Sequence, residues 1–145
     1  EVHDFEFRKD HWKSVLETIE YNPILIGKGT GGDRDFLYDT YKKYQLTSAY
    51  ELEYNAHNQY LEFTLDFGLI GLLCFVLMLS YLSYSFIKTK NTLAFTILAV
   101  FMVYFLTESL FQRHDGVVVF SLIISLLLAR GKKDSSIKNT FDNIK

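Results

Sequence analysis

The feature that most constrains the fold of this chain is an uncharged apolar run from Gly68 to Ile87. As a helix rising 1.5 Å per residue, its twenty residues would cross the roughly 30 Å hydrocarbon core of a bilayer. The run therefore predicts a transmembrane helix, although the mean hydropathy of +0.08 over the whole chain resembles that of a soluble protein. A soluble helical domain with buried hairpins is the alternative.

Two more apolar runs follow, at about 92–107 and 112–129, so we predict an all-α, polytopic membrane protein with three transmembrane helices. Basic residues cluster after the first and third runs: Lys88, Lys90, Arg130, Lys132 and Lys133. All of them fall on one side of the membrane, which the positive-inside rule makes cytoplasmic. Residues 1–67 and the loop 108–116 then share the opposite side, and residues 130–145 form a cytoplasmic tail.

We predict that residues 1–67 form a loop with amphipathic helices outside the membrane. A first helix is expected at 8–21, where one face carries Trp12, Val15, Leu16 and Ile19. The pair Asn22-Pro23 ends this helix, and a second helix is expected at about 35–45, before a polar linker at 46–55. The chain starts without a methionine or a signal peptide, so we expect earlier spans in a longer protein.

Several other classes of function fit the sequence poorly. The glycine-rich stretch G-K-G-T-G-G-D at 27–33 lacks the P-loop spacing and predicts a tight turn. The single cysteine, Cys74, can form no internal disulfide, and no Cys/His spacing typical of a metal site occurs. A net charge of −2 without a basic patch argues against nucleic acid. Tyrosines at 38, 41, 44, 50, 54 and 60 are typical of a membrane-interface belt, with sugar stacking as an alternative.

His57 stands where the polar loop gives way to the apolar run. If Asn55 caps the following helix, His57 lies in its first turn, where the helix dipole disfavours the imidazolium and attracts anions. A neutral imidazole beside a phosphate-binding site is what a general base needs. A histidine that makes one structural hydrogen bond at the membrane interface is the alternative.

Other charged residues are candidates for binding. Arg8, Arg34 and Arg113 could hold phosphate oxygens, because arginine is always charged and binds them bidentately. Each could equally be a solvated surface charge, and Arg113 could anchor the edge of a span. Glu62 and Asp66 lie one helical turn apart, as in a paired-carboxylate glycosidase. Acids on an exposed face, or a role for Glu62 in orienting a neighbouring residue, are the alternatives.

Four segments together resemble the signature of the O-antigen ligase/polymerase family of bacterial envelope proteins. They are R-K-D-H-W at 8–12, N-P-I-L-I-G-K-G-T-G at 22–31, A-H-N-Q-Y-L-E at 56–62 and G-L-I-G-L-L at 68–73. The similarity covers nearly the whole chain, and H-N-x-Y-L-E with G-x-x-G nearby is its most specific part. Some ligases have leucine where this chain has Trp12, so the resemblance leaves both ligase and polymerase open.

The resemblance implies an inner-membrane glycosyltransferase of GT-C-like character with a large periplasmic loop. It implies glycan transfer from undecaprenyl diphosphate to a hydroxyl of a lipid A core sugar or of another glycan, with inversion and without a metal or cofactor. The family histidine corresponds to His57, followed by Gly68, as general base. The family's loop arginine corresponds to Arg8, which would neutralise the leaving pyrophosphate. We expect substrate binding by Asn58, Glu62, Arg34 and Arg113.

Other functions remain open beside this interpretation. A protein O-oligosaccharyltransferase would use the same donor. A flippase or an assembly scaffold would be non-catalytic, but a transporter would be expected to show Gly/Pro-broken helices or charges at mid-span, and the three runs show neither. The expected partners are therefore the lipid-linked glycan donor, a glycan or lipid A core acceptor and membrane lipids, with no nucleic acid.

Overall fold

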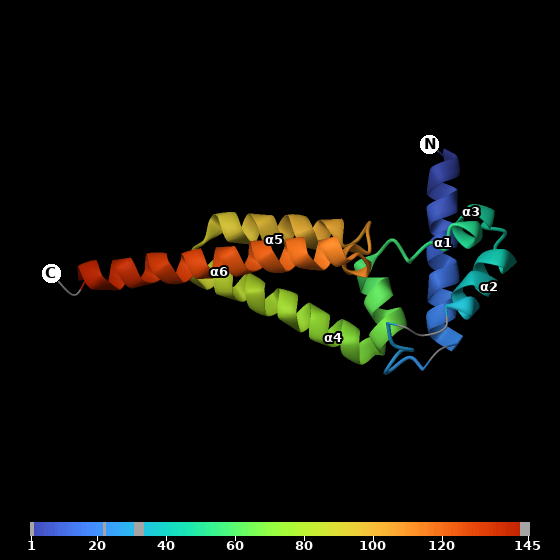
Figure 1. The fold of residues 1–145 in the computed structure, drawn as a ribbon, viewed down its shortest axis with the longest axis horizontal. Coiled ribbons are helices and arrows are strands. Elements are labelled where there is room, and N and C mark those ends of the chain that lie inside the picture. The colour runs from blue at the N-terminus through green and yellow to red at the C-terminus, as the bar shows by residue number, and fades with distance from the viewer. Residues whose placement is uncertain (1, 22, 31–33, 143–145) are drawn as a thin grey trace. The chain divides into compact units, whose positions relative to one another are not determined.

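The computed structural model describes the backbone of residues 2–21, 23–30 and 34–142, and the side chains of 7–21, 23–30 and 34–131. Within these ranges the chain is helical and contains no strand, which confirms the all-α prediction. The elements drawn in Figure 1 are α1 (Val2–Tyr21), α2 (Asp35–Lys43), α3 (Thr47–Glu51), α4 (Gln59–Lys88), α5 (Thr92–Tyr104), the 3-10 helix η1 (Leu110–Gln112) and α6 (His114–Asp142).

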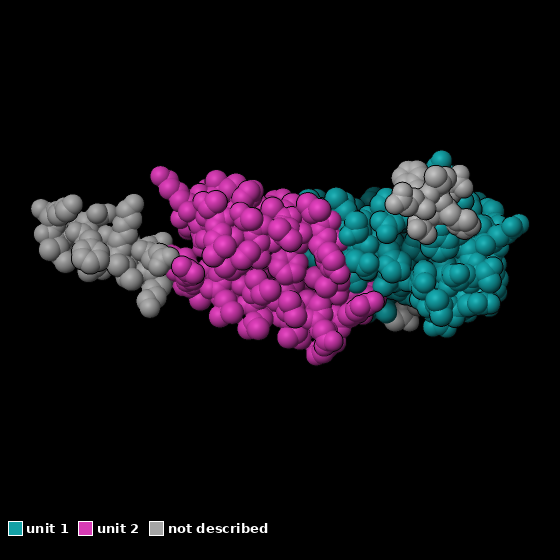
Figure 2. All heavy atoms as spheres, turned by 90° about the horizontal axis from the view of Figure 1, so that it is seen from above, with its two compact units in different colours: residues 1–76, 105–109 teal, residues 77–104, 110–145 magenta. Residues whose placement is uncertain are grey.

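The chain divides into two compact units, which Figure 2 colours separately. Unit 1 contains residues 1–76 and 105–109, and unit 2 contains residues 77–104 and 110–145. Unit 1 thus includes the first residues of the predicted span and the short segment after α5.

Helices α1, α2 and α3 surround the apolar core of unit 1. Its buried members are Val15, Ile19, Leu37, Tyr41, Leu46, Ala49, Ala56 and Leu65. Val15 and Ile19 of α1 belong to this core, as the apolar periodicity predicts. Leu16, which we assigned to the same face, is 53 % exposed, so that part of the prediction is wrong.

Polar side chains occupy the buried face of α1 in place of Leu16. His11, Ser14 and Thr18 follow one another at helical spacing and are all buried. The Ser14 hydroxyl donates to the His11 carbonyl (2.7 Å), and Thr18 Oγ1 lies 2.9 Å from Thr40 Oγ1 of α2. Burying a polar group is costly unless it is hydrogen-bonded, so these bonds allow α1 to turn a polar face inward.

The segment predicted as a polar linker contains a short helix. Helix α3 begins at Thr47, directly after Gln45 has reversed the chain with a φ of +56°. Leu46 and Ala49 are buried in the core of unit 1. The linker prediction is therefore wrong at 47–51, because these two apolar residues hold the segment against the core.

Helix α4 is interrupted at Gly68, which adopts a φ of +65° and a ψ of −165°. The interruption frees backbone groups on either side of Gly68, and the loop 23–29 bonds to them. The bonds, with the donor first, are Lys28 N to Leu65 O (3.2 Å), Gly29 N to Asp66 O (2.6 Å), Leu69 N to Ile24 O (2.8 Å) and Ile70 N to Leu25 O (3.2 Å). Figure 1 shows this loop, in blue, beside the bend in α4.

The loop approaches α4 closely because Gly27 faces the interruption. Gly27 has a φ of +65°, and a Cβ added there would lie 2.5 Å from the backbone of Asp66. Gly29 also has a positive φ, of +84°. The predicted tight turn is thus confirmed at these two glycines, while residues 31–33 of the glycine-rich stretch lie outside the described residues.

Unit 2 consists of apolar helices. Every buried polar side chain that the structure describes belongs to unit 1 and none to unit 2. Among the residues that the structure describes, two helices are long and apolar enough to cross a membrane, α4 and the 114–131 part of α6. This confirms the first and third predicted runs as candidate spans. Helix α5 is apolar but has only 13 residues, so its crossing of the membrane remains a prediction.

Candidate functional site

His57 lies in a turn that precedes α4. Asn55 Oδ1 accepts a hydrogen bond from the His57 amide (2.9 Å) and so closes this turn. The residue that caps α4 is Asn58, whose Oδ1 accepts from the amides of Tyr60 (3.0 Å) and Leu61 (3.1 Å). The expectation that Asn55 caps the helix, with His57 in its first turn, is therefore wrong.

The amides at the start of α4 are already bonded. The amide of Gln59 donates to the carbonyl of Phe105 (2.8 Å). The amide of Glu62 donates to the carbonyl of Asn58 (2.9 Å). Together with the two amides that the Asn58 side chain holds, these are the donors that a helix N-terminus otherwise offers to an anion. An anion beside His57 would therefore need side-chain donors.

Asn58 connects the turn to residues 105–109. Its Nδ2 donates to the carbonyl of Leu106 (3.1 Å), and the Ser109 hydroxyl accepts from its amide (3.1 Å). His57 itself has a φ of +45°, a left-handed conformation that costs about 1–2 kcal/mol for a residue with a Cβ. The contacts of Asn58 hold the chain on either side of this conformation, which is a positioning role; substrate binding by Asn58 remains a prediction.

His57 pairs with a carboxylate from the segment after α5. Its Nδ1 lies 3.3 Å from Oε2 of Glu108. Both side chains are partly accessible, with 34 % of His57 and 40 % of Glu108 exposed. Sequence reasoning placed Glu108 in the charged loop on the side of His57 but favoured Arg113 from that loop. A carboxylate on one ring nitrogen fixes the tautomer and leaves the other nitrogen to face a ligand.

Glu62 anchors the same turn from inside unit 1 and is fully buried. Its Oε2 accepts from the amide of Ala56 (2.8 Å) and from the hydroxyl of Ser109 (3.3 Å). Its Oε1 accepts from Nη2 of Arg34 (2.6 Å). The alternative of an exposed acid is therefore wrong, and the contacts favour the orienting role. Substrate contact by Glu62 remains a prediction.

Arg34 binds both members of the predicted carboxylate pair. Its Nη2 lies 2.6 Å from Glu62 and 3.1 Å from Asp66 Oδ1, and both acids are buried. Burial by itself lowers the pKa of Arg34, but the charges of Glu62 and Asp66 outweigh it and raise that pKa. A glycosidase pair needs one carboxyl that can donate a proton to the substrate, whereas both of these carboxyl groups bind the same arginine. The pair is thus better described as a buried ionic cluster.

His11 is the candidate that sequence reasoning missed. Its ring centroid lies 5.7 Å from that of His57, and its Nε2 lies 3.0 Å from the hydroxyl of Tyr41. Burial lowers the pKa of His11 to about 4, and the positive charges of His57 and Arg8 act in the same direction, against a hydrogen bond to the backbone of Asn55. The available signal was its helical spacing from Ser14 and Thr18.

The remaining predicted arginines differ in their surroundings. Arg8 is exposed on α1, one turn before His11, and its charge acts on that ring. Helix α1 therefore brings Arg8 to the neighbourhood of His57 through His11. Arg113 is exposed in unit 2, directly before α6. Substrate binding by Arg113 remains a prediction.

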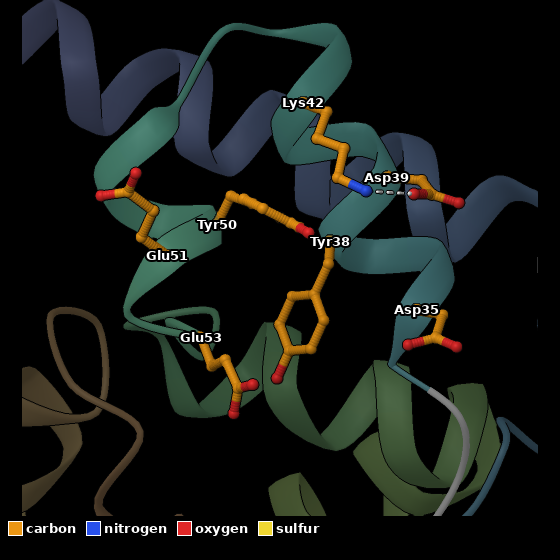
Figure 3. A pocket seen from close by; sticks show the side chains of 7 residues that line it. All are labelled: Asp35, Tyr38, Asp39, Lys42, Tyr50, Glu51 and Glu53. Carbon is orange, nitrogen blue, oxygen red and sulfur yellow. Dashed lines mark hydrogen bonds and ion pairs between the residues drawn. The ribbon is translucent and has the colours of Figure 1, made fainter.

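A separate pocket of about 520 Å³ lies between α2 and the segment around α3. Its lining residues, drawn in Figure 3, are Asp35, Tyr38, Asp39, Lys42, Tyr50, Glu51 and Glu53. Lys42 Nζ bonds to Asp39 (3.3 Å) and stands 4.4 Å above the ring of Tyr50.

Tyr41, which we assigned to a membrane-interface belt, is instead fully buried in unit 1, so that assignment is wrong.

Among the described residues, no group of three or more His, Cys, Asp or Glu side chains could hold a metal ion. The carboxylates nearest to His57 instead act as hydrogen-bond acceptors, as the contacts of Glu62 and Glu108 show.

Comparison with known proteins shows two similarities. The chain is 33 % identical over 85 residues to a protein of Haemophilus influenzae (strain ATCC 51907 / DSM 11121 / KW20 / Rd) that bears the name "Uncharacterized protein". The match covers 59 % of this chain but only 21 % of that relative, so the chain spans about a fifth of its length. No solved structure matches. The family model described as "O-Antigen ligase" matches residues 1–76, just over half of the 145 residues, and the chain therefore belongs to the O-antigen ligase family of membrane proteins.

Proposed function

We propose that this chain carries the catalytic loop of a glycosyltransferase that moves a glycan from undecaprenyl diphosphate to an acceptor hydroxyl. The observation that carries the proposal is the contact between His57 and Glu108 within residues matched by, or packed against, the family's region. A half-exposed histidine held by a carboxylate is suited to taking a proton from a ligand. Lipid-linked sugars also fit a chain with two candidate membrane spans.

The proposed reaction breaks one bond and forms another at the anomeric carbon. With its Nδ1 proton directed at Glu108, His57 accepts the proton of the acceptor hydroxyl at Nε2. The acceptor oxygen then bonds to the anomeric carbon, and the bond from that carbon to the pyrophosphate oxygen breaks. Undecaprenyl diphosphate leaves with the bonding electrons, and Glu108 stabilises the imidazolium that forms. Attack from the face opposite the leaving group would invert the centre.

The leaving pyrophosphate needs positive charge, which no free amide of α4 supplies. Arg8 is the best-placed candidate, because it is exposed and makes no ion pair with any side chain that the structure describes. Arg34 is a weaker candidate, since its guanidinium is held by Glu62 and Asp66. Stabilising developing charge with fixed cations is commonly the largest contribution to such catalysis.

Ligase and polymerase activities share this chemistry and differ in the acceptor. A strain lacking the protein would accumulate long lipid-linked chains if the protein is a ligase, and single lipid-linked repeat units if the protein is a polymerase.

The proposal that residues 1–67 lie on the periplasmic side is tested separately. A cysteine placed at Thr47 should react with a membrane-impermeant label from outside the cytoplasm, and labelling only after the membrane is opened would contradict that side.

The test of the catalytic proposal is His57→Gln, compared with Glu108→Gln and with the exposed His114→Gln as the matched control. We expect glycan transfer to fall by roughly 10²–10⁴-fold for His57→Gln, the usual contribution of a general base. Glu108→Gln should lose less, and His114→Gln should be unaffected. Normal transfer by His57→Gln, with the protein present in the membrane at its usual level, would remove His57 from the mechanism and favour a non-catalytic role.

A further inference from the structure

The loop 23–29 presents an unusual apolar surface. Ile24, Leu25 and Ile26 are consecutive and are 46 %, 60 % and 66 % exposed. Leu69 and Ile70, the first residues of α4 after Gly68, are also exposed and donate their amides to Ile24 and Leu25. These five exposed side chains therefore come from two backbone segments that are bonded to each other, and we call them the loop patch.

The backbone of this loop is satisfied internally to a degree that a loop in water does not need. The amides of residues 26 to 29 all donate, to the carbonyls of Pro23, Leu65 and Asp66. The carbonyls of Ile24 and Leu25 accept from α4, and Pro23 has no amide to satisfy. Non-helical backbone at membrane depth is tolerated only when its polar groups are bonded within the protein. The loop meets that condition at the amides of residues 26 to 29 and at the carbonyls of Ile24 and Leu25, while its apolar side chains are exposed.

The position of the loop along α4 sets its depth. Residues 69–88 follow the interruption as a continuous helix, about long enough at 1.5 Å per residue to cross the hydrocarbon core. Bonds to Leu69 and Ile70 hold the loop at the first turn of this crossing segment. Lys28 is exposed, with its Nζ 5.6 Å from the ring centroid of Phe36, and a long lysine side chain next to an apolar segment can extend its charge to the headgroup level.

We propose that the loop patch is a second membrane contact, with Ile24, Leu25 and Ile26 among the acyl chains at the boundary where α4 enters the bilayer. This goes beyond the glycosyltransferase proposal, because it requires neither the donor nor His57. The occupant is the bilayer itself, since the patch includes the first turn of α4 after Gly68 and so adjoins the apolar surface of a candidate span. Exposed apolar patches of this kind mark membrane or partner contacts.

The test measures depth with a fluorescent label. In the complete protein with its native cysteines, including Cys74, replaced, single cysteines are introduced as Leu25→Cys and, as an exposed control in α3, Glu51→Cys. Each is labelled with nitrobenzoxadiazole and reconstituted into phosphatidylethanolamine–phosphatidylglycerol vesicles that contain no polyprenyl lipid. The quenchers are phosphatidylcholine with a doxyl group near the carbonyl end of one chain, and aqueous iodide. Ile26→Cys provides a second reading if the Leu25 variant disturbs the loop.

We expect the doxyl lipid to quench the label at position 25 roughly twofold, since interfacial segments bury their apolar face about 5–10 Å into the acyl boundary. Iodide should quench the fluorescence of the label at Glu51→Cys and should leave the fluorescence of the label at Leu25→Cys unchanged. Equal iodide quenching at the two positions, without doxyl quenching, would overturn the proposal. Protection from both quenchers that disappears when the protein is diluted in lipid would also overturn it, and would assign the patch to a second copy of the chain.

Discussion

Helix α1 buries both polar and apolar side chains, whereas helix α6 buries no polar side chain among its described residues. The described buried residues of α1 are His11, Ser14, Val15, Thr18 and Ile19, whereas those of α6 are Gly116, Phe120, Ile124 and Leu127. Their exposed surfaces look alike at single positions, since Leu16 is 53 % exposed and Leu122 is 57 % exposed. The interior of unit 1 therefore combines apolar packing with hydrogen bonds between specific partners, whereas that of unit 2 depends on apolar packing.

This difference indicates which part of such a chain can hold charged and reactive side chains at fixed positions. A polar interior holds charged groups at fixed positions, because each group needs its partner. Glu62 is buried in unit 1 with three hydrogen-bonded neighbours, and no charged side chain that the structure describes is buried in unit 2. Four experiments, one of which compares the two units directly, can break or sharpen this view.

The largest effect is expected from Glu62→Ala. Removing one member of a buried ion pair typically costs about 3–5 kcal/mol, because its partner is left without a counter-charge. Here Arg34, the Ala56 amide and the Ser109 hydroxyl all lose an acceptor. Thermal unfolding in detergent should show the loss, and the exposed control Glu51→Ala should unfold like the unmodified protein. Equal stability of the two variants would mean that the buried cluster is not formed.

The next comparison places a lysine at each of the two exposed leucines. Leu122→Lys should raise the free energy of membrane insertion of α6 by about 2.5–3.5 kcal/mol, the cost of lysine near the centre of a span. Leu16→Lys should change stability by no more than about 0.5 kcal/mol, as an exposed substitution in water does. A glycosylation-mapping assay measures the first and thermal unfolding the second. If Leu122→Lys left membrane insertion unchanged, as Leu16→Lys is expected to leave stability, α6 would not be surrounded by hydrocarbon.

A pH dependence is expected from His11, which faces Arg8, Tyr41 and His57. Its pKa in the folded protein is about 4, below the usual 6.5, so the unfolded chain binds the proton more readily. The stability is therefore complete above about pH 6.5 and decreases as the pH falls toward 4, by up to about 3 kcal/mol. Unfolding midpoints measured over this range should drop less steeply for His11→Gln. An unchanged slope would show that another group is responsible.

The smallest effect is expected from two glycine substitutions in the loop 23–29. Both Gly27→Ala and Gly29→Ala place a side chain at a positive φ, at a cost of about 1–2 kcal/mol each. Only a Cβ at position 27 would also overlap the backbone of Asp66, at 2.5 Å, whereas a Cβ at position 29 would meet nothing within 4 Å. Amide hydrogen exchange at Leu69 and Ile70 should accelerate only in Gly27→Ala. Equal acceleration in both variants would mean that strain alone, rather than the close approach, governs the loop.

The sequence predicts the helices well and their buried faces less well. Helices at 8–21 and about 35–45 and the candidate spans follow from apolar periodicity and length. The burial of His11 and exposure of Leu16 do not, since hydrophobicity alone assigns a polar residue to the surface. Helix α3 was missed because five residues carry too short a pattern.

The candidate site was likewise predicted only in part from the sequence. His57 was identified from its place before an apolar run and from the resemblance of its neighbours to a family. Its partner Glu108 lies 51 positions later, and no local pattern specifies such a pairing. The capping by Asn58 was mistaken for capping by Asn55 because both asparagines fit the pattern, and only the bonds from the amides of Tyr60 and Leu61 to the Asn58 side chain decide between them.

The long separation between His57 and Glu108 also sets an order of events during synthesis. Residues 105–109 follow α5, so the ribosome makes all of α4 and α5 before Glu108 exists. At about 5–20 residues per second, the 51 positions correspond to a delay of roughly 3–10 s. During that interval Asn58 and Glu62 lack the partners that Leu106 and Ser109 later supply. The site can therefore be completed only after both helices have been synthesised, which makes its assembly a late event in the production of this chain.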